Sequence, residues 1–239
     1  MNIGDRKERS REIEEQIVQP VANKVYQDNN LNFKRYTEKD YQYKGVDIEI
    51  DGVLYDEKTN VEYAYDEYEK YGKVCPLRNV FIELATKNRA GKYELGWYMK
   101  KNHLTEGYIF NLITEIKDNQ PIHGVMLFIS VKELEKLIDY EIFDLRRYCY
   151  RLEQLVKEQE KTHQIEENKP LRLNYTGGYY ISNKIYQEKF KKKNNLYMLV
   201  PSAPYKFQMC LNKDVPEEPY SLQVSLELLK TKCHKIINY

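Results

Sequence analysis

Two periods of hydrophobic residues run along this chain, and together they predict a mixture of helices and strands. In residues 6–27 apolar side chains recur at helical spacing, as Ile13, Ile17 and Val21 illustrate. This spacing places them on one face of a helix. Pro20 lies within the segment and predicts a kink or a break, because proline lacks the N–H that a helix interior needs.

Helical spacing returns in three later segments, which are residues 131–139, 143–161 and 221–237. Ser130 precedes the first of these, with Glu133 at the third position, a pattern in which both side chains bond the free N–H groups of a helix start. Residues 28–40 are expected to form a loop or a weak element. The acidic, tyrosine-rich residues 60–75 are expected to form a long surface excursion.

Shorter β-prone runs bounded by turn residues predict strands. The predicted strands are residues 43–50, 53–59, 79–86, 93–99, 124–130 and 196–200. Residues 103–116 fit either a helix or a strand. This mixture predicts a mixed α/β fold, in which helices flank a central mixed β-sheet.

Asp51-Gly52 lies between the first two predicted strands and predicts a tight hairpin, because a type I′ turn needs positive φ at both central residues. A two-residue turn pairs Ile50 with Val53, Glu49 with Leu54, Ile48 with Tyr55, and Asp47 with Asp56. Side chains alternate between the two faces of a strand. One face then carries Asp47, Glu49, Leu54, Asp56 and Lys58, and the other carries Val46, Ile48, Ile50, Val53 and Tyr55.

Two carboxylates directly opposite each other destabilise a sheet unless they are solvated or a cation lies between them. Hard divalent cations such as Mg²⁺ prefer carboxylate oxygens, so Asp47 and Asp56 form a candidate metal site. Lys58 shares their face and is placed to orient water or phosphate. A solvent-facing strand pair with ordinary surface charges explains the same pattern, and a shift of one residue in the pairing would separate the two acids.

Composition narrows the classes of protein without naming a function. The formal net charge is +1, so a nucleic acid would need a local basic patch. The four cysteines form no CxxC pair and the four histidines no HExxH motif, which argues against a zinc site. Apolar runs such as Val125–Ile129 are far shorter than the roughly 20 residues of a membrane span. The charged start of the chain lacks the apolar run of a secretory signal, so a cytoplasmic protein without a membrane partner is expected.

Asp47 followed by Asp56-Glu57-Lys58 resembles the D-(X)n-(D/E)-X-K signature of the PD-(D/E)XK nuclease superfamily. The resemblance extends over residues 5–140, although Val46 stands where the fullest pattern has proline. Four segments also resemble a group of uncharacterised bacterial and phage proteins associated with this fold. They are Tyr-Asp-Glu-Lys-Thr (55–59), Phe-Ile-Glu-Leu (81–84), Gly-Trp (96–97) and Thr-Glu-Gly-Tyr-Ile-Phe (105–110).

The resemblance implies a restriction-endonuclease-like core with its site on the hairpin. Asp47 and Asp56 become metal ligands, Glu57 is a further candidate ligand, and Lys58 becomes the cation that orients water or phosphate. Many members add a glutamate from the first helix. Glu14 is the candidate for this role because it shares a helix face with the apolar residues, and Glu15 is second. Glu83 is an auxiliary candidate, or a residue that satisfies a buried partner.

The function implied is a Mg²⁺-dependent endonuclease, with Mn²⁺ as a substitute, acting on double- or single-stranded DNA. Residues 1–142 would form the core, and residues 143–239 an α/β extension for DNA contact or homodimerisation. Within the extension, Lys189, Lys191, Lys192 and Lys193 could bind phosphates, or could form a solvated loop. The alternative is a non-catalytic accessory protein that binds nucleic acid or protein and keeps the fold.

Overall fold

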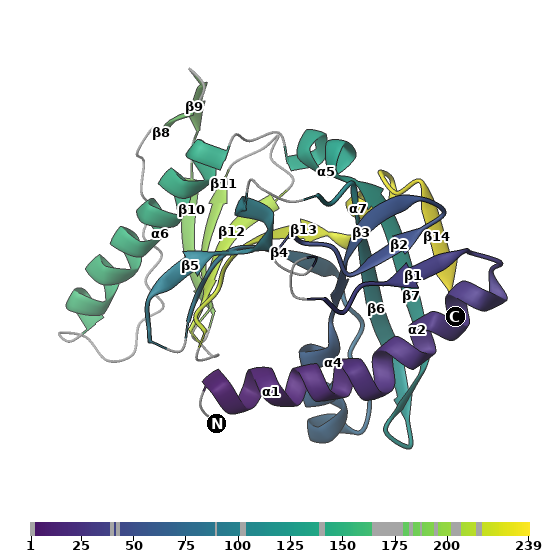
Figure 1. Ribbon diagram of the computed structural model, residues 1–239. Helices are drawn as coiled ribbons and strands as arrows, with labels where there is room; N and C mark the ends of the chain where they lie inside the picture. Colours follow the sequence, from purple (N-terminus) through teal and green to yellow (C-terminus); the bar gives the residue numbers. More distant parts are fainter. Residues whose placement is uncertain are drawn as a thin grey trace. The chain divides into compact units, whose positions relative to one another are not determined.

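A computed structural model arranges the chain as two six-stranded sheets with helices packed on them (Figure 1). It describes residues 3–38, 41, 44–88, 90–100, 104–138, 142–163, 179–181, 184–186, 188–193, 196–201, 207–213 and 217–239. The mixed α/β class predicted from the sequence is therefore confirmed. The chain divides into two compact units, the first of which is Met1–Arg78, Lys101–Leu137 and Leu226–Tyr239, and the second Asn79–Lys100 and Ile138–Ser225.

The first unit is built on a mixed sheet with the strand order β1-β2-β3-β6-β7-β14. Its strands are β1 (Phe33–Arg35), β2 (Ile48–Ile50), β3 (Val53–Thr59), β6 (Gly107–Lys117), β7 (Gln120–Ser130) and β14 (Lys235–Asn238). Neighbouring strands are antiparallel except for β3 and β6, which are parallel. A parallel pair needs a crossover connection, and the chain between β3 and β6 includes the helix α4 (Val61–Tyr71).

One long helical run opens the first unit and appears purple in Figure 1. It consists of α1 (Ile3–Ile13), a π-helical turn η1 (Glu14–Val18) and α2 (Gln19–Asp28). A kink or a break was expected at Pro20, and the helical run continues through the proline. The Gln19 N–H donates to the carbonyl of Glu14, five residues back, directly before the proline. The wider π turn accommodates a residue that cannot donate its own hydrogen bond.

Helix α2 covers the sheet of the first unit with its apolar face. Ala22, Val25 and Tyr26 are buried against side chains of five strands. The strand residues of this core are Ile48, Ile50, Tyr55, Ile109, Met126, Phe128 and Ile237. The core therefore joins the start of the chain, the hairpin and β14, which are far apart in the sequence. Two shorter helices, α5 (Val131–Ile138) and α7 (Leu226–Lys230), complete the unit.

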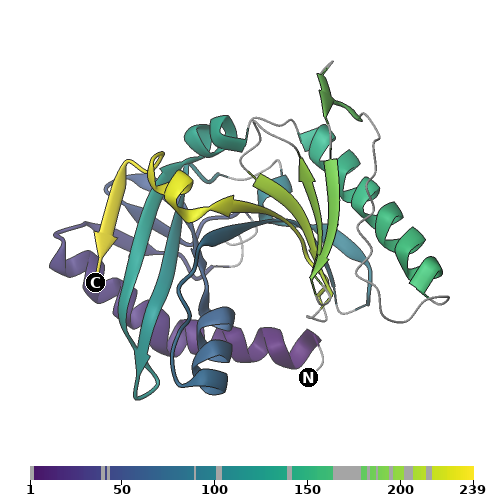
Figure 2. The same cartoon turned by 180° about the vertical axis from the view of Figure 1, so that it is seen from behind.

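The second unit is built on an antiparallel sheet with the order β10-β11-β12-β13-β4-β5. Its strands are β4 (Asn79–Lys87), β5 (Tyr93–Leu95), β10 (Glu188–Lys193), β11 (Leu196–Pro201), β12 (Phe207–Asn212) and β13 (Tyr220–Ser225). Figure 2 shows α6 (Ile142–His163) beside this sheet, and it contacts β11 and β12. A short turn η2 (Trp97–Met99) and a hairpin of β8 (Tyr179–Ile181) and β9 (Lys184–Tyr186) also belong to it.

The two units interleave along the chain, which differs from the contiguous division into residues 1–142 and 143–239. Strand β4 pairs with β13, so residues 79–86 belong to the second sheet and not to the sheet of the hairpin. Strand β14 pairs with β7 and returns the end of the sequence to the first unit. Both pairings join segments more than 100 residues apart, and hydrophobic periodicity carries no information about such partners.

Residues 60–75 and 221–237 were predicted wrongly. The first segment contains the helix α4, which buries Val61, Ala64 and Tyr65 at helical spacing and ends at Gly72 with a positive φ of 67°. The second segment is not one helix, because β13, α7 and β14 divide it. Pairing of β13 with β4 supplies backbone hydrogen bonds that outweigh the local preference for helix.

Several other predicted elements are present but have different bounds. Strand β2 is shorter than the predicted residues 43–50, and residues 42–43 lie outside the described part of the chain. The ambiguous residues 103–116 include all of the strand β6 except Lys117, and residues 93–99 divide into β5 and η2. The predicted cap of α5 is confirmed, since the Glu133 N–H donates to Ser130 Oγ at 3.2 Å.

Candidate functional site

The β2–β3 hairpin has the predicted turn, and its register matches the predicted one up to Ile48 and Tyr55 but not at Asp47 and Asp56. Asp51 and Gly52 have φ values of 51° and 83°, as a type I′ turn requires. Three pairs match the expected ones: Ile50 with Val53, Glu49 with Leu54, and Ile48 with Tyr55. Beyond these pairs the ladder changes, because the Asp47 N–H donates to the carbonyl of Tyr55 at 3.0 Å. Asp47 therefore stands just outside the regular pairing.

Asp47 and Asp56 nevertheless lie together. The pKa of Asp47 is raised from 3.8 to about 7, first by burial and then by the charge of Asp56 and a hydrogen bond between the two side chains. Lys58 and the Glu57 N–H oppose this rise, the latter by donating to Asp47 Oδ2 at 3.0 Å. Asp47 and Asp56 are thus close to each other, and repulsion between the two carboxylates contributes to the raised pKa of Asp47.

The carboxylate face of the hairpin is not an ordinary solvent face. Asp56 is only 2 % exposed, and Lys58 Nζ lies 2.5 Å from its Oδ1. On the opposite face, Ile48 and Tyr55 are buried in the core as expected, whereas Val53 is 36 % exposed. A charged side chain is seldom buried without a partner, and here the partner of Asp56 is Lys58.

Glu14 belongs to the same cluster. It lies in η1, and its pKa is raised from 4.5 to about 7, first by burial and then by the charges of Glu57 and Asp47. Lys58 lowers the same pKa, so this lysine is within electrostatic reach of Glu14 as well. Glu15 is exposed and forms an ion pair with Arg11 at 3.6 Å. Of the two helix glutamates, Glu14 is therefore the one within electrostatic reach of Glu57, Asp47 and Lys58.

The cluster contains more acid than base, which is the electrostatic condition that a divalent cation relieves. Glu14, Asp47 and Asp56 supply carboxylate oxygens, the donors that Mg²⁺ prefers. One described lysine, Lys58, lies among them and is bound to Asp56. Asp47 and Asp56 fit a metal ion by chemistry and proximity. Within the described ranges, however, no group of three or more His, Cys, Asp or Glu side chains is already arranged to hold one.

Glu57, the third candidate ligand, is engaged elsewhere. Its side chain is 5 % exposed and lies on the side of α2, where Tyr26 Oη donates to Oε1 at 2.8 Å. Arg35 Nη1 binds Oε2 at 2.8 Å, and Asn111 Nδ2 approaches Oε1 at 3.4 Å. Alternation along β3 turns Glu57 away from Asp56 and Lys58. Both of its oxygens are thus occupied by protein donors.

The other predicted residues lie in the second unit. Glu83 is in β4 opposite Ser221 of β13, in the second unit, and its auxiliary role stays a prediction. Lys189, Lys191, Lys192 and Lys193 lie in β10, an outer strand of the second sheet, and not in a loop. The loop expectation is therefore wrong for this run, and its role in binding phosphates stays a prediction.

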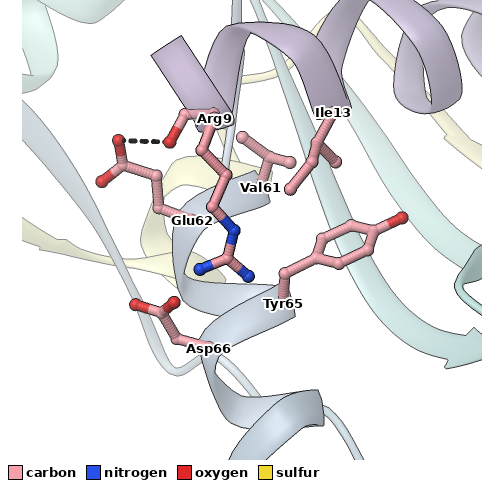
Figure 3. Close-up of a pocket in the computed structure, with 7 residues that line it drawn as sticks. Arg9, Ile13, Val61, Glu62, Tyr65 and Asp66 are labelled. Atoms are coloured by element: carbon pink, nitrogen blue, oxygen red, sulfur yellow. Dashed lines mark hydrogen bonds between the residues drawn. The ribbon is translucent and has the colours of Figure 1, made fainter. Parts of the chain in front are cut away.

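A small pocket lies between α1 and α4 in the first unit (Figure 3). It is lined by Arg9, Ser10, Ile13, Val61, Glu62, Tyr65 and Asp66. Ser10 Oγ donates to Glu62 Oε1 at 2.8 Å. The pocket encloses about 20 Å³, which is room for about one water molecule. It is too small for a nucleotide and includes none of the hairpin acids.

Sequence reasoning missed the surroundings of Glu57. Tyr26 and Arg35 come from the leading helix and from β1, and Asn111 comes from β6. A charged residue in an otherwise core-facing position of β3 was the available signal, because buried charge needs partners. Which residues supply those partners depends on the sheet order, and the sequence pattern does not reveal it.

Comparisons with known proteins identify no relative from which a function could be assigned. No family model, curated protein sequence or solved structure matches this chain. In the parts of the chain that the structure places, every helix is too short or too polar to span a bilayer. The partly buried acidic cluster of Glu14, Asp47 and Asp56 with Lys58 is accordingly the feature from which a function is argued.

Proposed function

We propose that this protein is a Mg²⁺-dependent endonuclease that hydrolyses phosphodiester bonds of DNA at the hairpin cluster. The observation that carries the proposal is the meeting of Asp47 and Asp56, largely withdrawn from water, with Lys58 beside them. A chain gains nothing in stability from two such acids side by side, so a cation that binds between them explains their arrangement. The resemblance to the PD-(D/E)XK superfamily supports the same assignment.

Asp47 and Asp56 would hold the metal ion through carboxylate oxygens. When bound, Mg²⁺ supplies charge neutralisation at the phosphate and lowers the pKa of a coordinated water. Lys58 keeps an ammonium group beside the carboxylates, where it stabilises negative charge developing on the phosphate. Glu14 has a pKa near neutrality, so its carboxyl can take up a proton from the attacking water at physiological pH.

One observation favours a second candidate, a non-catalytic accessory protein that binds nucleic acid or protein. Among the described side chains no ready group of three metal ligands is present, and Lys58 already neutralises Asp56. In that case the acids and the lysine would form a structural network. The near-neutral net charge of +1 is compatible with either reading.

Cleavage of plasmid and single-stranded DNA with Mg²⁺ or Mn²⁺ tests the proposal. We expect Asp56→Asn and Lys58→Met to lower the rate by on the order of 100-fold or more, as for loss of a metal ligand or a charge-stabilising group. Glu14→Gln should also lower the rate, whereas the exposed neighbour Glu15→Gln serves as the matched control and should not. Absence of cleavage by the wild type with either metal, or full activity of Asp56→Asn, would reject the nuclease in favour of the accessory protein.

A further inference from the structure

Glu57 stands between the two hairpin residues that form the ion pair, but its side chain faces the opposite way. Three protein groups reach its carboxylate: the hydroxyl of Tyr26, the guanidinium of Arg35 and the amide of Asn111. Asn111 is fully buried, and the side chain of Arg35 is 14 % exposed. A carboxylate held by so many donors in the core has one orientation.

The backbone of the same residue points at the site. The Glu57 N–H donates to Asp47 Oδ2 at 3.0 Å. Regular pairing of β2 with β3 ends at Ile48 and Tyr55, so no backbone carbonyl of β2 is paired with this N–H. The Asp47 carboxylate takes the place that the next carbonyl of the ladder would have. Glu57 is thus anchored through its side chain and bonded to Asp47 through its backbone.

The network around Glu57 extends to Tyr239, which directly follows β14. Tyr239 Oη donates to Asn111 Oδ1 at 2.8 Å, which orients the amide that reaches Glu57. The backbone of Tyr239 pairs with Gly124 in both directions, at 2.9 and 3.0 Å. A Cβ on Gly124 would come within 2.4 Å of the Tyr239 ring, so glycine is what lets the ring lie there.

We propose that Glu57 is a positioning residue, which the Tyr26, Arg35 and Asn111 network holds in place so that its N–H orients the Asp47 carboxylate toward Asp56. It is not itself a metal ligand, because its oxygens are already bound by protein donors. The role of this contact in metal binding rests on the proposed function, since Asp47 is a metal ligand only if the protein binds Mg²⁺. The geometric part concerns one N–H and one carboxylate and is testable without any substrate.

Tyr26→Phe is the sharpest variant, since it removes one donor from Glu57 and keeps the charge, the ring and the hairpin. Tyr65→Phe is its matched control. Tyr65 is also buried in the first unit, and its hydroxyl bonds the Asn119 carbonyl at 2.9 Å, away from Glu57. Hydrogen exchange at the Glu57 N–H, followed by NMR, reports on its bond to Asp47, and the Tyr55 N–H in the same strand is the internal reference.

We expect Tyr26→Phe to speed exchange at Glu57 by about tenfold relative to Tyr55, the effect of weakening one hydrogen bond, and Tyr65→Phe to leave that ratio unchanged. Equal acceleration at both amides, or none at Glu57, would overturn the positioning role and leave a purely structural network.

A second measurement separates this inference from the proposed function. If the wild type cleaves DNA, Tyr26→Phe should raise the Mg²⁺ concentration needed for half-maximal rate by several-fold, and Tyr65→Phe should not. A lower fraction of folded protein would change the maximal rate and not this concentration, so an unchanged Mg²⁺ requirement counts against positioning. If the wild type neither binds Mg²⁺ nor cleaves DNA, the proposed function fails, and the exchange ratio still decides whether Glu57 orients Asp47.

Discussion

Acids that are buried or partly buried dominate the candidate site at the scale of single residues. Glu14 and Asp47 both have pKa values raised to about 7, chiefly because burial withdraws them from water. The buried charge of Asp56 is paired with the ammonium group of Lys58, which lies 2.5 Å away. The arrangement costs stability when the acids are ionised and no cation is bound. Stability should therefore depend on pH and on metal ions in a defined direction.

Asp47 is the residue at which this dependence can be tested. Its pKa is about 7 in the folded protein against 3.8 ordinarily, so the folded state binds more protons than the unfolded state between about pH 4 and pH 7. The free energy of unfolding should fall as pH rises through that window. We expect Asp47→Asn to stabilise the metal-free protein at pH 8 by more than about 1 kcal/mol, since one unit of pKa difference corresponds to about 1.4 kcal/mol.

Urea unfolding in the presence of EDTA at pH 5 and pH 8 measures this difference. Glu15→Gln is the control, because Glu15 is exposed and should alter the free energy little at either pH. Adding Mg²⁺ at pH 8 should stabilise the wild type and not Asp47→Asn if the acids bind the ion. If Asp47→Asn destabilised the protein equally at both pH values, the prediction that ionised Asp47 lowers the free energy of unfolding would be contradicted.

At the scale of elements, the β2–β3 hairpin is what brings the acids together. Its turn sets the register, and the register sets which side chains share a face. The π turn η1 makes a comparable contribution on the helix, since it carries Glu14 and precedes Pro20. These are local devices of a few residues each. Changing the turn should therefore affect stability without removing any side chain from the cluster.

Gly52→Ala isolates the contribution of the hairpin turn. Gly52 has φ of 83°, and a Cβ there would meet no atom within 4 Å, so the cost is one of backbone conformation alone. We expect Gly52→Ala to lower the free energy of unfolding by about 1–2 kcal/mol. Gly52→Asn should cost less, because asparagine tolerates positive φ. Urea unfolding compares the three proteins, and an asparagine variant less stable than the alanine variant would contradict the assigned turn.

At the scale of the whole molecule, each unit is assembled from separated stretches of chain. The first unit takes its last strand from the end of the sequence, where β14 pairs with β7. Ile237 of β14 belongs to the same core as Tyr26 and Tyr55. Such long-range contacts slow folding, because the entropy cost of loop closure must be met before they form. The stability of the first unit should therefore depend on residues that the hairpin does not contain.

Ile237→Ala and Ile236→Ala form a matched pair for this dependence. Ile237 is 5 % exposed and lies in the core, whereas its neighbour Ile236 is 42 % exposed. We expect Ile237→Ala to cost about 2–4 kcal/mol through lost burial and the cavity it leaves. Ile236→Ala should change stability by about 0.5 kcal/mol or less. Denaturant unfolding followed by far-UV circular dichroism compares the two variants. Equal losses in the free energy of unfolding would show that Ile237 does not anchor β14.

Sequence alone was sufficient wherever a few neighbouring residues decide the outcome. The Asp51-Gly52 turn, the pairing of Ile48 with Tyr55, and the Ser130 cap all follow from short-range sterics and hydrogen bonding. The same reasoning failed for residues 60–75, where Val61, Ala64 and Tyr65 already had helical spacing that could have been recognised. It could not succeed for residues 221–237, because the partners of β13 and β14 lie more than 100 residues away.

The features of the candidate site also divide into those that follow from local sequence and those that depend on distant segments. The sequence by itself determined the turn and the register from Ile50–Val53 to Ile48–Tyr55, because alternation and turn geometry act over adjacent residues, and the structure decided how Asp47 meets Asp56 beyond that register. Only the tertiary structure decided that Asp56 is buried, that Glu14 joins the acids, and that Glu83 lies in the other unit. It also turned Glu57 from a candidate ligand into a residue held by protein donors. Burial and partner choice depend on which distant segments come together, and no local pattern encodes that.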